Sequence, residues 1–169
     1  MDFVSEAIVL QARKHGESSA IMETFTRTMG RHNGLVRGGA GRRMRPLLQA
    51  GNVVEVEWRG RLEEHLGYYT VEIVQALAGT YMEDRLSLAA VNSIAALLQE
   101  MLPEKQPLEA LYDVTKIVLE RLDQPDVWPA LYVRWESVML QALGYGLDLS
   151  QCAATEATDN LTHVSPRSG

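Results

Sequence analysis

The hydrophobic pattern changes its period near Gly79, and this change limits the fold more than any other feature of the sequence. Before Gly79, apolar and polar residues alternate, as they do in strands with one buried face. After it, apolar residues recur at intervals of three and four, as in amphipathic helices. The pattern predicts an α+β chain in which a strand region at residues 1–80 precedes a helical region at residues 81–169.

The strand region contains about five short runs, separated by glycines that are typical of turns. The apolar positions that share a face within a run are Ile8, Leu10 and Ala12; Ile21 and Phe25; Val54, Val56 and Trp58; and Tyr69, Val71 and Ile73. A further short strand is expected over residues 33–36. Five short strands fit a small closed barrel, which leaves no exposed sheet edge. We expect a five-stranded OB-fold β-barrel, with an SH3-like barrel as the second choice.

Three amphipathic helices are predicted between residues 82 and 146, and together they indicate an α-helical bundle domain. Their apolar stripes are Leu86, Ala90, Ile94, Leu97, Leu98 and Met101; Leu108, Leu111, Tyr112, Thr115, Leu119 and Leu122; and Leu131, Trp135, Val138, Met139 and Ala142. Pro103, Pro125 and Gly144 end the three stripes. Asp113, Lys116 and Glu120 alternate in charge along one face, which we expect to be exposed to solvent.

Charge is divided unevenly between the two regions. Residues 1–61 carry ten Lys and Arg against six Asp and Glu, a balance of +4, whereas residues 62–169 carry six against sixteen, a balance of −10. The overall charge of −6 therefore conceals a basic first third. This separation indicates two surfaces with different partners, and it favours nucleic acid for the strand region.

Residues 30–46 are the most basic stretch, with five arginines, five glycines and no acidic residue. Such a segment fits an anionic partner, for which a sugar-phosphate backbone is the obvious candidate. The alternative is a solvated surface loop. The candidate DNA-binding residues of the strand region are Arg13, Lys14, Arg27, Arg31, Arg37, Arg42, Arg43, Arg45, Arg59 and Arg61. Among the aromatic residues, Trp58 and Tyr69 are expected in the core, and Tyr68 is the best candidate for stacking on a base.

Catalysis and metal binding have little support in the sequence. No Gly-x-Ser-x-Gly elbow and no phosphate-binding Walker loop occurs, so we expect no enzyme activity. The four histidines, His15, His32, His65 and His163, are expected on the surface. Cys152 stands alone, and a structural zinc site needs about four ligands, so we expect a small buried hydrophobic residue and no metal cofactor.

The sequence predicts no membrane partner and no export. No run of about 18 apolar residues occurs, and the N-terminus lacks the basic region of a secretory signal. A single cysteine fits a reducing compartment. We therefore expect a cytoplasmic, nucleoid-associated protein.

A series of short motifs resembles the bacterial recombination mediator family RecO. They are residues 16–21 (GESSAI), 25–27 (FTR), 30–31 (GR), 36–38 (VRG), 48–49 (LQ), 56–59 (VEWR), 135–136 (WE), 143–145 (LGY), Leu149 with Cys152, and 164–169 (VSPRSG). Each motif is weak alone, but their order and spacing along the chain make the resemblance specific.

The resemblance implies an N-terminal OB fold, a helical domain and, in many members, a zinc-binding insert. It implies binding to single- and double-stranded DNA, annealing of complementary strands, and contacts with RecR and single-stranded DNA-binding protein that help RecA load. Zinc-bearing members have a Cys-x-x-Cys pair where this chain has Cys152 and Thr155, so zinc is not expected here. Relatives continue past the last motif, so we also expect a C-terminally truncated chain.

Arg121 and Arg134 are isolated cations beside apolar helix faces. They could seat an acidic, hydrophobic peptide tail such as that of single-stranded DNA-binding protein, or they could be ordinary surface arginines. Two alternatives to the family function remain open at this point: an OB-fold module that binds RNA, and one that binds only protein.

Overall fold

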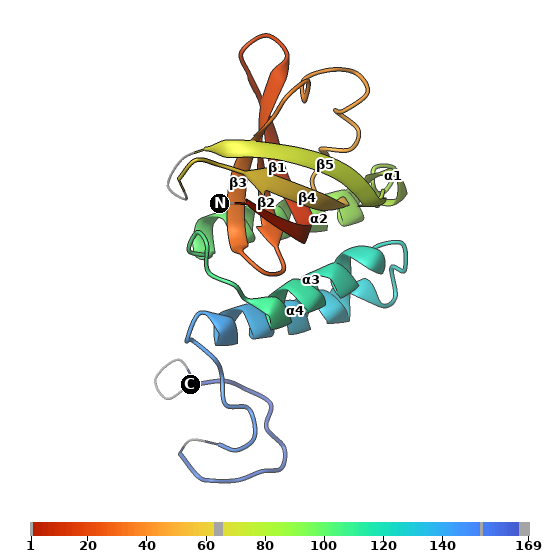
Figure 1. Ribbon diagram of the computed structural model, residues 1–169. Helices are drawn as coiled ribbons and strands as arrows, with labels where there is room; N and C mark the ends of the chain where they lie inside the picture. Colours follow the sequence, from red (N-terminus) through yellow and green to blue (C-terminus); the bar gives the residue numbers. More distant parts are fainter. Residues whose placement is uncertain (1, 63–65, 153, 166–169) are drawn as a thin grey trace.

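The strand region forms a closed barrel (Figure 1). The computed structural model describes residues 2–62, 66–152 and 154–165. Its strands are β1 (Asp2–His15), β2 (Ser19–Thr26), β3 (Gly30–Val36), β4 (Val53–Arg59) and β5 (Gly67–Gln75). The order around the barrel is β1-β2-β3-β5-β4, in which only β3 and β5 run parallel. This architecture confirms the predicted five-stranded OB-type barrel, although β3 begins three residues before the predicted strand.

The helical region follows as α1 (Ala78–Tyr81), α2 (Arg85–Met101), α3 (Glu109–Glu120) and α4 (Trp128–Ala142). The three predicted helices are confirmed, and the four-residue α1 was missed because it is too short to show a periodic pattern. The domain boundary expected at residue 80 falls inside α1. Asp84 caps α2, since its carboxylate accepts a hydrogen bond of 2.7 Å from the Ser87 N–H. In Figure 1, α3 and α4 run side by side below the barrel.

The inside of the barrel is filled by alternate residues of the strands. Its buried cluster comprises Ala7, Val9, Ala20, Met22, Val36, Leu48, Val54, Val56, Trp58 and Tyr69. Trp58 and Tyr69 pair across β4 and β5, which confirms the expectation that both belong to the core. Ile73 lies farther along β5 and remains 40% exposed, so the predicted face ends before it.

The pattern in β1 differs from the predicted alternation because a bulge interrupts it. Ile8 and Leu10 face the helices, but the pairing with β2 shifts between Val9 and Gln11. Ala12 therefore pairs with Met22, a residue of the barrel interior, and no longer shares a face with Ile8. The sequence carries no sign of this extra residue, because a bulge depends on the partner strand.

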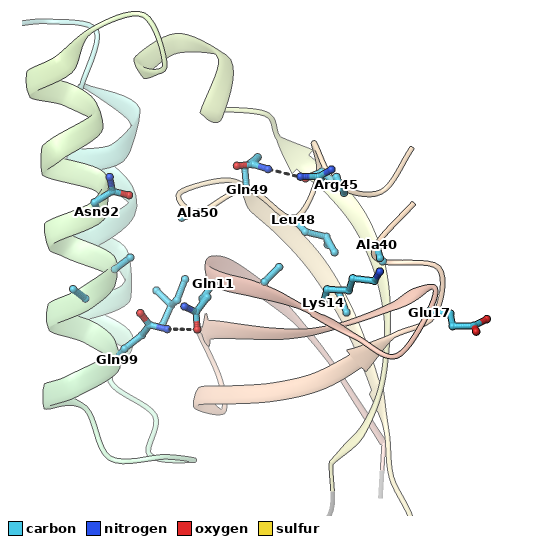
Figure 2. A pocket seen from close by; sticks show the side chains of 16 residues that line it. Gln11, Lys14, Glu17, Ala40, Arg45, Leu48, Gln49, Ala50, Asn92 and Gln99 are labelled. Carbon is cyan, nitrogen blue, oxygen red and sulfur yellow. Dashed lines mark hydrogen bonds between the residues drawn. The ribbon is translucent and has the colours of Figure 1, made fainter. Parts of the chain in front are cut away.

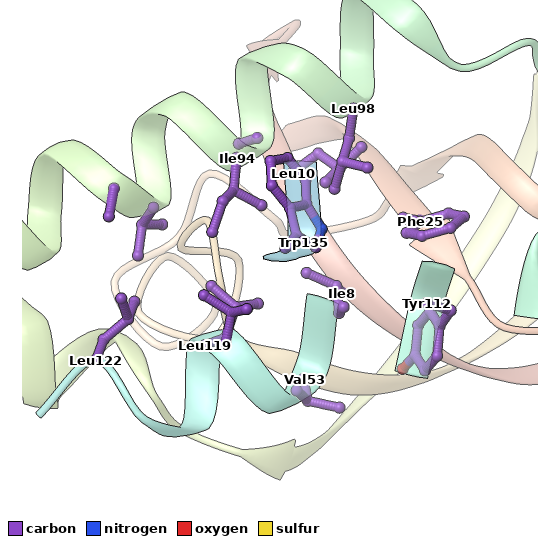
Figure 3. Packing of buried hydrophobic residues seen from close by; sticks show 14 of the residues in the cluster. Ile8, Leu10, Phe25, Val53, Ile94, Leu98, Tyr112, Leu119, Leu122 and Trp135 are labelled. Atoms are coloured by element: carbon purple, nitrogen blue, oxygen red, sulfur yellow. The ribbon is translucent and has the colours of Figure 1, made fainter. Parts of the chain in front are cut away.

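A second hydrophobic core joins the barrel to the helices (Figure 3). Ile8, Leu10, Phe25 and Val53 on the outer face of the barrel pack with residues of all four helices. The buried helical members are Ala78, Tyr81, Ala90, Val91, Ile94, Ala95, Leu98, Leu111, Tyr112, Val118, Leu119, Trp135 and Met139. The rings of Phe25 and Tyr112 meet edge to face, with centroids 5.6 Å apart. The helices are therefore a layer on the barrel and have no core of their own.

Charged residues on α3 make contacts across this junction. Arg27 at the end of β2 bonds to Asp113 through Nε at 3.0 Å and lies 2.8 Å from Glu109. Lys116 donates to Glu6 of β1 at 2.9 Å. The expectation of a solvent face is therefore wrong for Lys116, which is only partly exposed, whereas Asp113 is exposed as predicted and pairs with Arg27 as well. Helical spacing identifies residues that share a face, but it does not say which part of the chain that face meets.

One histidine is buried inside the barrel, contrary to expectation. His32 is 5% exposed, and its Nδ1 lies 3.1 Å from the Tyr69 hydroxyl, which in turn lies 3.1 Å from the Thr24 hydroxyl. Burial, and secondarily the charge of Lys105, lowers the pKa of His32 to about 4. His15 and His163 are exposed as predicted, and His65 lies outside the described residues.

Replacing Phe25 with Ala should lower the free energy of unfolding by about 3–5 kcal/mol, because it empties part of the shared core. Urea unfolding followed by circular dichroism at 222 nm measures this loss. Helix signal and barrel amide protection from hydrogen exchange should disappear together, since one core serves both modules. The control is Ile73→Ala, which removes a side chain that is 40% exposed and should cost much less. Separate transitions for the two modules would contradict the shared core.

The buried imidazole predicts a specific dependence of stability on pH. The folded-state pKa of about 4 lies below the ordinary value of 6.5, so between these values only the unfolded chain binds the proton. Stability should therefore fall as pH falls from 6.5 to 4, by up to about 3 kcal/mol. Urea titrations at pH 7, 5.5 and 4.5 should show a shallower decline for His32→Gln than for the unmodified protein. Equal declines would show that His32 does not contribute.

Candidate nucleic-acid interface

The basic stretch of the sequence divides between β3 and an ordered loop. Residues 37–52 join β3 to β4, and their turns are closed by backbone hydrogen bonds such as Gly41 N–H to Gly38 O at 2.9 Å. The Ala40 N–H donates to Ser18 O at 2.9 Å, which ties the loop to the β1–β2 hairpin. Leu48 is buried in the barrel cluster, and Met44 packs against that cluster. These contacts hold the loop in an ordered conformation.

This loop and the neighbouring hairpin present five exposed cations, which we call the loop patch: Arg13, Lys14, Arg42, Arg43 and Arg45. Lys14 and Arg45 line the same cleft between the hairpin, the loop and α2 (Figure 2). Arg42 and Arg45 line a second hollow beside α1. No carboxylate in the described part of the chain forms an ion pair with any member of the loop patch.

A second group, the Tyr68 patch, comprises Arg37, Arg59, Arg61 and Tyr68. The Arg37 guanidinium lies over the exposed ring of Tyr68, 4.4 Å from its centroid. Arg59, Arg61 and Tyr68 line a shallow hollow at the start of β5. Arg59 also bonds to Glu57, with its Nε 2.9 Å from the carboxylate, so part of its charge is offset within the strand. Arg37 connects the two patches, because it begins the loop that carries Arg42.

Arg27 and Arg31 lie apart from both patches. Arg27 pairs with Asp113 and Glu109 of α3, as described above. Arg31 is half-buried, bonds to Glu23 at 2.5 Å and donates to Leu102 O at 3.0 Å. The structure thus engages these two cations in the junction with the helices and leaves the other eight candidates outside it.

The two candidate docking residues are both exposed on the helical region. Arg121 directly follows α3, and Arg134 lies within α4 beside Val133, which is 64% exposed. The sequence identified both residues as isolated cations beside apolar helix faces. The polar residues that line the cleft with Lys14 were not identified from the sequence, because they come from three separate segments.

Cys152 lies in the segment that follows α4. Cys152 is half-buried, so the expectation of a buried hydrophobic residue is wrong, and a hydrogen bond from Thr155 lowers the pKa of its thiol. Among the described residues, no group of three or more His, Cys, Asp or Glu could hold a metal ion. Within those residues, each helix is too short or too polar to span a bilayer.

Comparisons with known proteins agree with this architecture. The family model "Recombination protein O N terminal" matches residues 1–77, and "Recombination protein O C terminal" matches residues 82–169. Curated relatives named "DNA repair protein RecO" include those of Ruegeria sp. strain TM1040, at 49% identity, and Jannaschia sp. strain CCS1, at 48%. Each alignment covers all of this chain and 70% or 69% of the relative. The two family models and these alignments, which span all of this chain, show that it belongs to the RecO family.

Proposed function

We propose that this chain is a DNA repair and recombination mediator that binds single- and double-stranded DNA through the loop patch and the Tyr68 patch. The observation that carries the proposal is the loop of residues 37–52, which holds Arg42, Arg43 and Arg45 exposed and without an ion-pair partner among the described residues. Arginine forks bind phosphate oxygens in pairs. The relatives' printed name, DNA repair protein RecO, supports the same role.

The proposed mechanism is positioning, with no covalent step. Cations on the hairpin and loop neutralise the backbones of two strands, which reduces their mutual repulsion and raises their local concentration. Complementary strands held in this way anneal. Because few exposed aromatic residues accompany the cations, binding is led by the backbone and has weak sequence preference. Tyr68, already covered by Arg37, provides one stacking surface.

The proposed partners follow from the family. Together with RecR, the protein helps RecA load onto single strands coated by single-stranded DNA-binding protein. It acts in the cytoplasm, at the nucleoid. Arg121 and Arg134 form the proposed docking site for the acidic tail of single-stranded DNA-binding protein, since they are exposed cations on helices that also expose Ile117 and Val133.

Reversing Arg42, Arg43 and Arg45 to Glu should abolish binding to a labelled single-stranded oligonucleotide at physiological salt. Fluorescence anisotropy at several salt concentrations measures both affinity and its salt dependence. For the unmodified chain, log affinity should fall with log salt by about 0.7 per phosphate neutralised. The same variant should fail to anneal complementary strands that are coated with single-stranded DNA-binding protein.

The matched control reverses three exposed arginines of the helical region, Arg85, Arg121 and Arg134, and so changes net charge equally. It should retain DNA affinity. Equal loss in both triple variants would show that net charge, and not the loop patch, controls binding. Tighter binding to a matched RNA oligonucleotide would favour an RNA-binding module, because only RNA offers the 2′-hydroxyl. A flat salt response would favour a protein-interaction module.

Replacing Arg121 and Arg134 with Ala should weaken binding of the tail peptide of single-stranded DNA-binding protein by about tenfold, which corresponds to about 1.4 kcal/mol. Isothermal titration calorimetry should use the full chain, because the helices share their core with the barrel. The Arg42, Arg43 and Arg45 variant serves as the control and should bind the peptide normally. Unchanged affinity in the Arg121 and Arg134 variant would remove the docking site.

A further inference from the structure

A cleft of about 660 Å³ lies between the β1–β2 hairpin, the loop of residues 37–52 and α2 (Figure 2). Its walls come from three segments that are distant in the sequence, and it exists because α2 packs beside the barrel without covering the hairpin. This volume is in the range of small-molecule sites in proteins. The cleft shares Lys14 and Arg45 with the loop patch.

Four carboxamides line the cleft: Gln11 on β1, Gln49 on the loop, and Asn92 and Gln99 on α2. Gln99 donates to Glu23 at 2.9 Å and to Gln11 at 3.5 Å, and Gln49 donates to Arg45 O at 3.1 Å. The Asn92 carboxamide has no hydrogen-bond partner in the described part of the chain, and it is exposed on the cleft side of α2 (Figure 2). The Asn92 amide nitrogen therefore offers two N–H donors to a ligand, and the carbonyl oxygens of Asn92 and Gln49 offer two acceptors.

Small side chains form much of the remaining wall. Ala95 and Ala96 of α2 line it, as do Ala40 and Ala50 of the loop. Because these alanine side chains are short, they leave room for a flat ring in several orientations. A carboxamide that faces such a space can bond to the mixed donor and acceptor edge of a purine or a pyrimidine.

The charges at the cleft match a nucleotide. Lys14 and Arg45 are cations, and Glu17 is the one carboxylate among the described lining residues. The net charge of the lining residues is therefore positive, and the cations lie beside the amide groups. A nucleotide likewise carries an anionic phosphate next to a base with hydrogen-bonding groups. A bulky apolar ligand fits less well, because four amides and three charged groups lie along the walls.

We propose that this cleft receives one unstacked nucleobase of a bound single strand. Asn92 and Gln49 hydrogen-bond to the edge of the base, and Lys14 and Arg45 hold the adjoining phosphate. The inference rests on the proposed DNA binding, and it adds a pocket for a base to a surface on which the other proposed contacts are to the backbone and, through Tyr68, by stacking. A strand held this way has one base withdrawn from its neighbours, so the cleft favours single-stranded over double-stranded DNA.

The test compares a single-stranded oligonucleotide with an abasic oligomer of the same length and charge, by anisotropy. The unmodified chain should bind the normal strand about tenfold more tightly, since a pair of hydrogen bonds to the edge of a base contributes an energy of this order. Ala96→Phe, which fills the cleft, should reduce that ratio severalfold while the salt dependence stays the same. Ala130→Phe, the same change at an exposed position of α4, is the control and should leave the ratio unchanged.

Thermal unfolding followed by circular dichroism shows whether Ala96→Phe folds. If it does not fold, a second variant still tests the base site. Asn92→Leu keeps the side-chain size, removes the hydrogen-bonding groups, and breaks no hydrogen bond among the described residues, where Asn92 is exposed. It should also lower the ratio, and it should reduce the differences in affinity among oligonucleotides of different base composition.

The possible results distinguish failure of the proposed DNA binding from failure of the proposed base site. If the unmodified chain binds neither oligomer, the proposed function itself fails. If it binds both oligomers equally, or if the cleft variants keep the full ratio, the base site fails and backbone binding stands. Competition by a free deoxynucleoside monophosphate at micromolar concentration would assign the cleft to a soluble nucleotide, and would likewise overturn a site for strands.

Discussion

The burial of both faces of β1 over residues 7–10 is the constraint on which the rest of the structure depends. Ala7 and Val9 point into the barrel, while Ile8 and Leu10 join the core shared with the helices. If the barrel stood alone, the outer apolar face of this strand would be exposed to water, which is unfavourable. The helices supply the missing cover. Their packing on the barrel's outer face then determines which surfaces of the barrel stay open.

Electrostatics follows from this packing. Where the helices meet the barrel, carboxylates of α3 pair with Arg27, and Glu6 of β1 pairs with Lys116 and accepts from the Tyr112 hydroxyl at 3.0 Å. Ion pairs that are this exposed contribute little to stability, about 1 kcal/mol or less each. Their effect is on orientation, because wrong placements of α3 would leave like charges together. The acidic helical region thus neutralises the cations nearest to it and leaves the hairpin and loop basic.

The remaining surface combines three features that suit a nucleic-acid strand. Exposed arginines on an ordered loop provide phosphate contacts, Tyr68 provides a ring, and the amide-lined cleft provides hydrogen bonds at the edge of a base. The relative positions of these features depend on the β1–β2 hairpin and the loop of residues 37–52. The hydrogen bond from the Ala40 N–H to Ser18 O holds the hairpin and the loop together. Arg121 directly follows α3 and Arg134 lies within α4, so the proposed protein contact and the proposed DNA contact use different modules.

The sequence by itself determined the five strands, the three longer helices, the barrel class and the family, but not the short α1. Period two in the strands and period 3.6 in the helices are properties of the local backbone, and Trp58 and Tyr69 were assigned to the core on that basis. It also identified the candidate cations, because charge is a property of each residue. Only the tertiary structure decided the phase of β1 after its bulge, the burial of His32, and the pairing of Arg27 and Arg31 with acids. The cleft, too, needed the fold, because Gln11, Gln49 and Asn92 meet there only when distant segments pack. Local patterns state which residues share a face, and packing across the chain decides what that face meets.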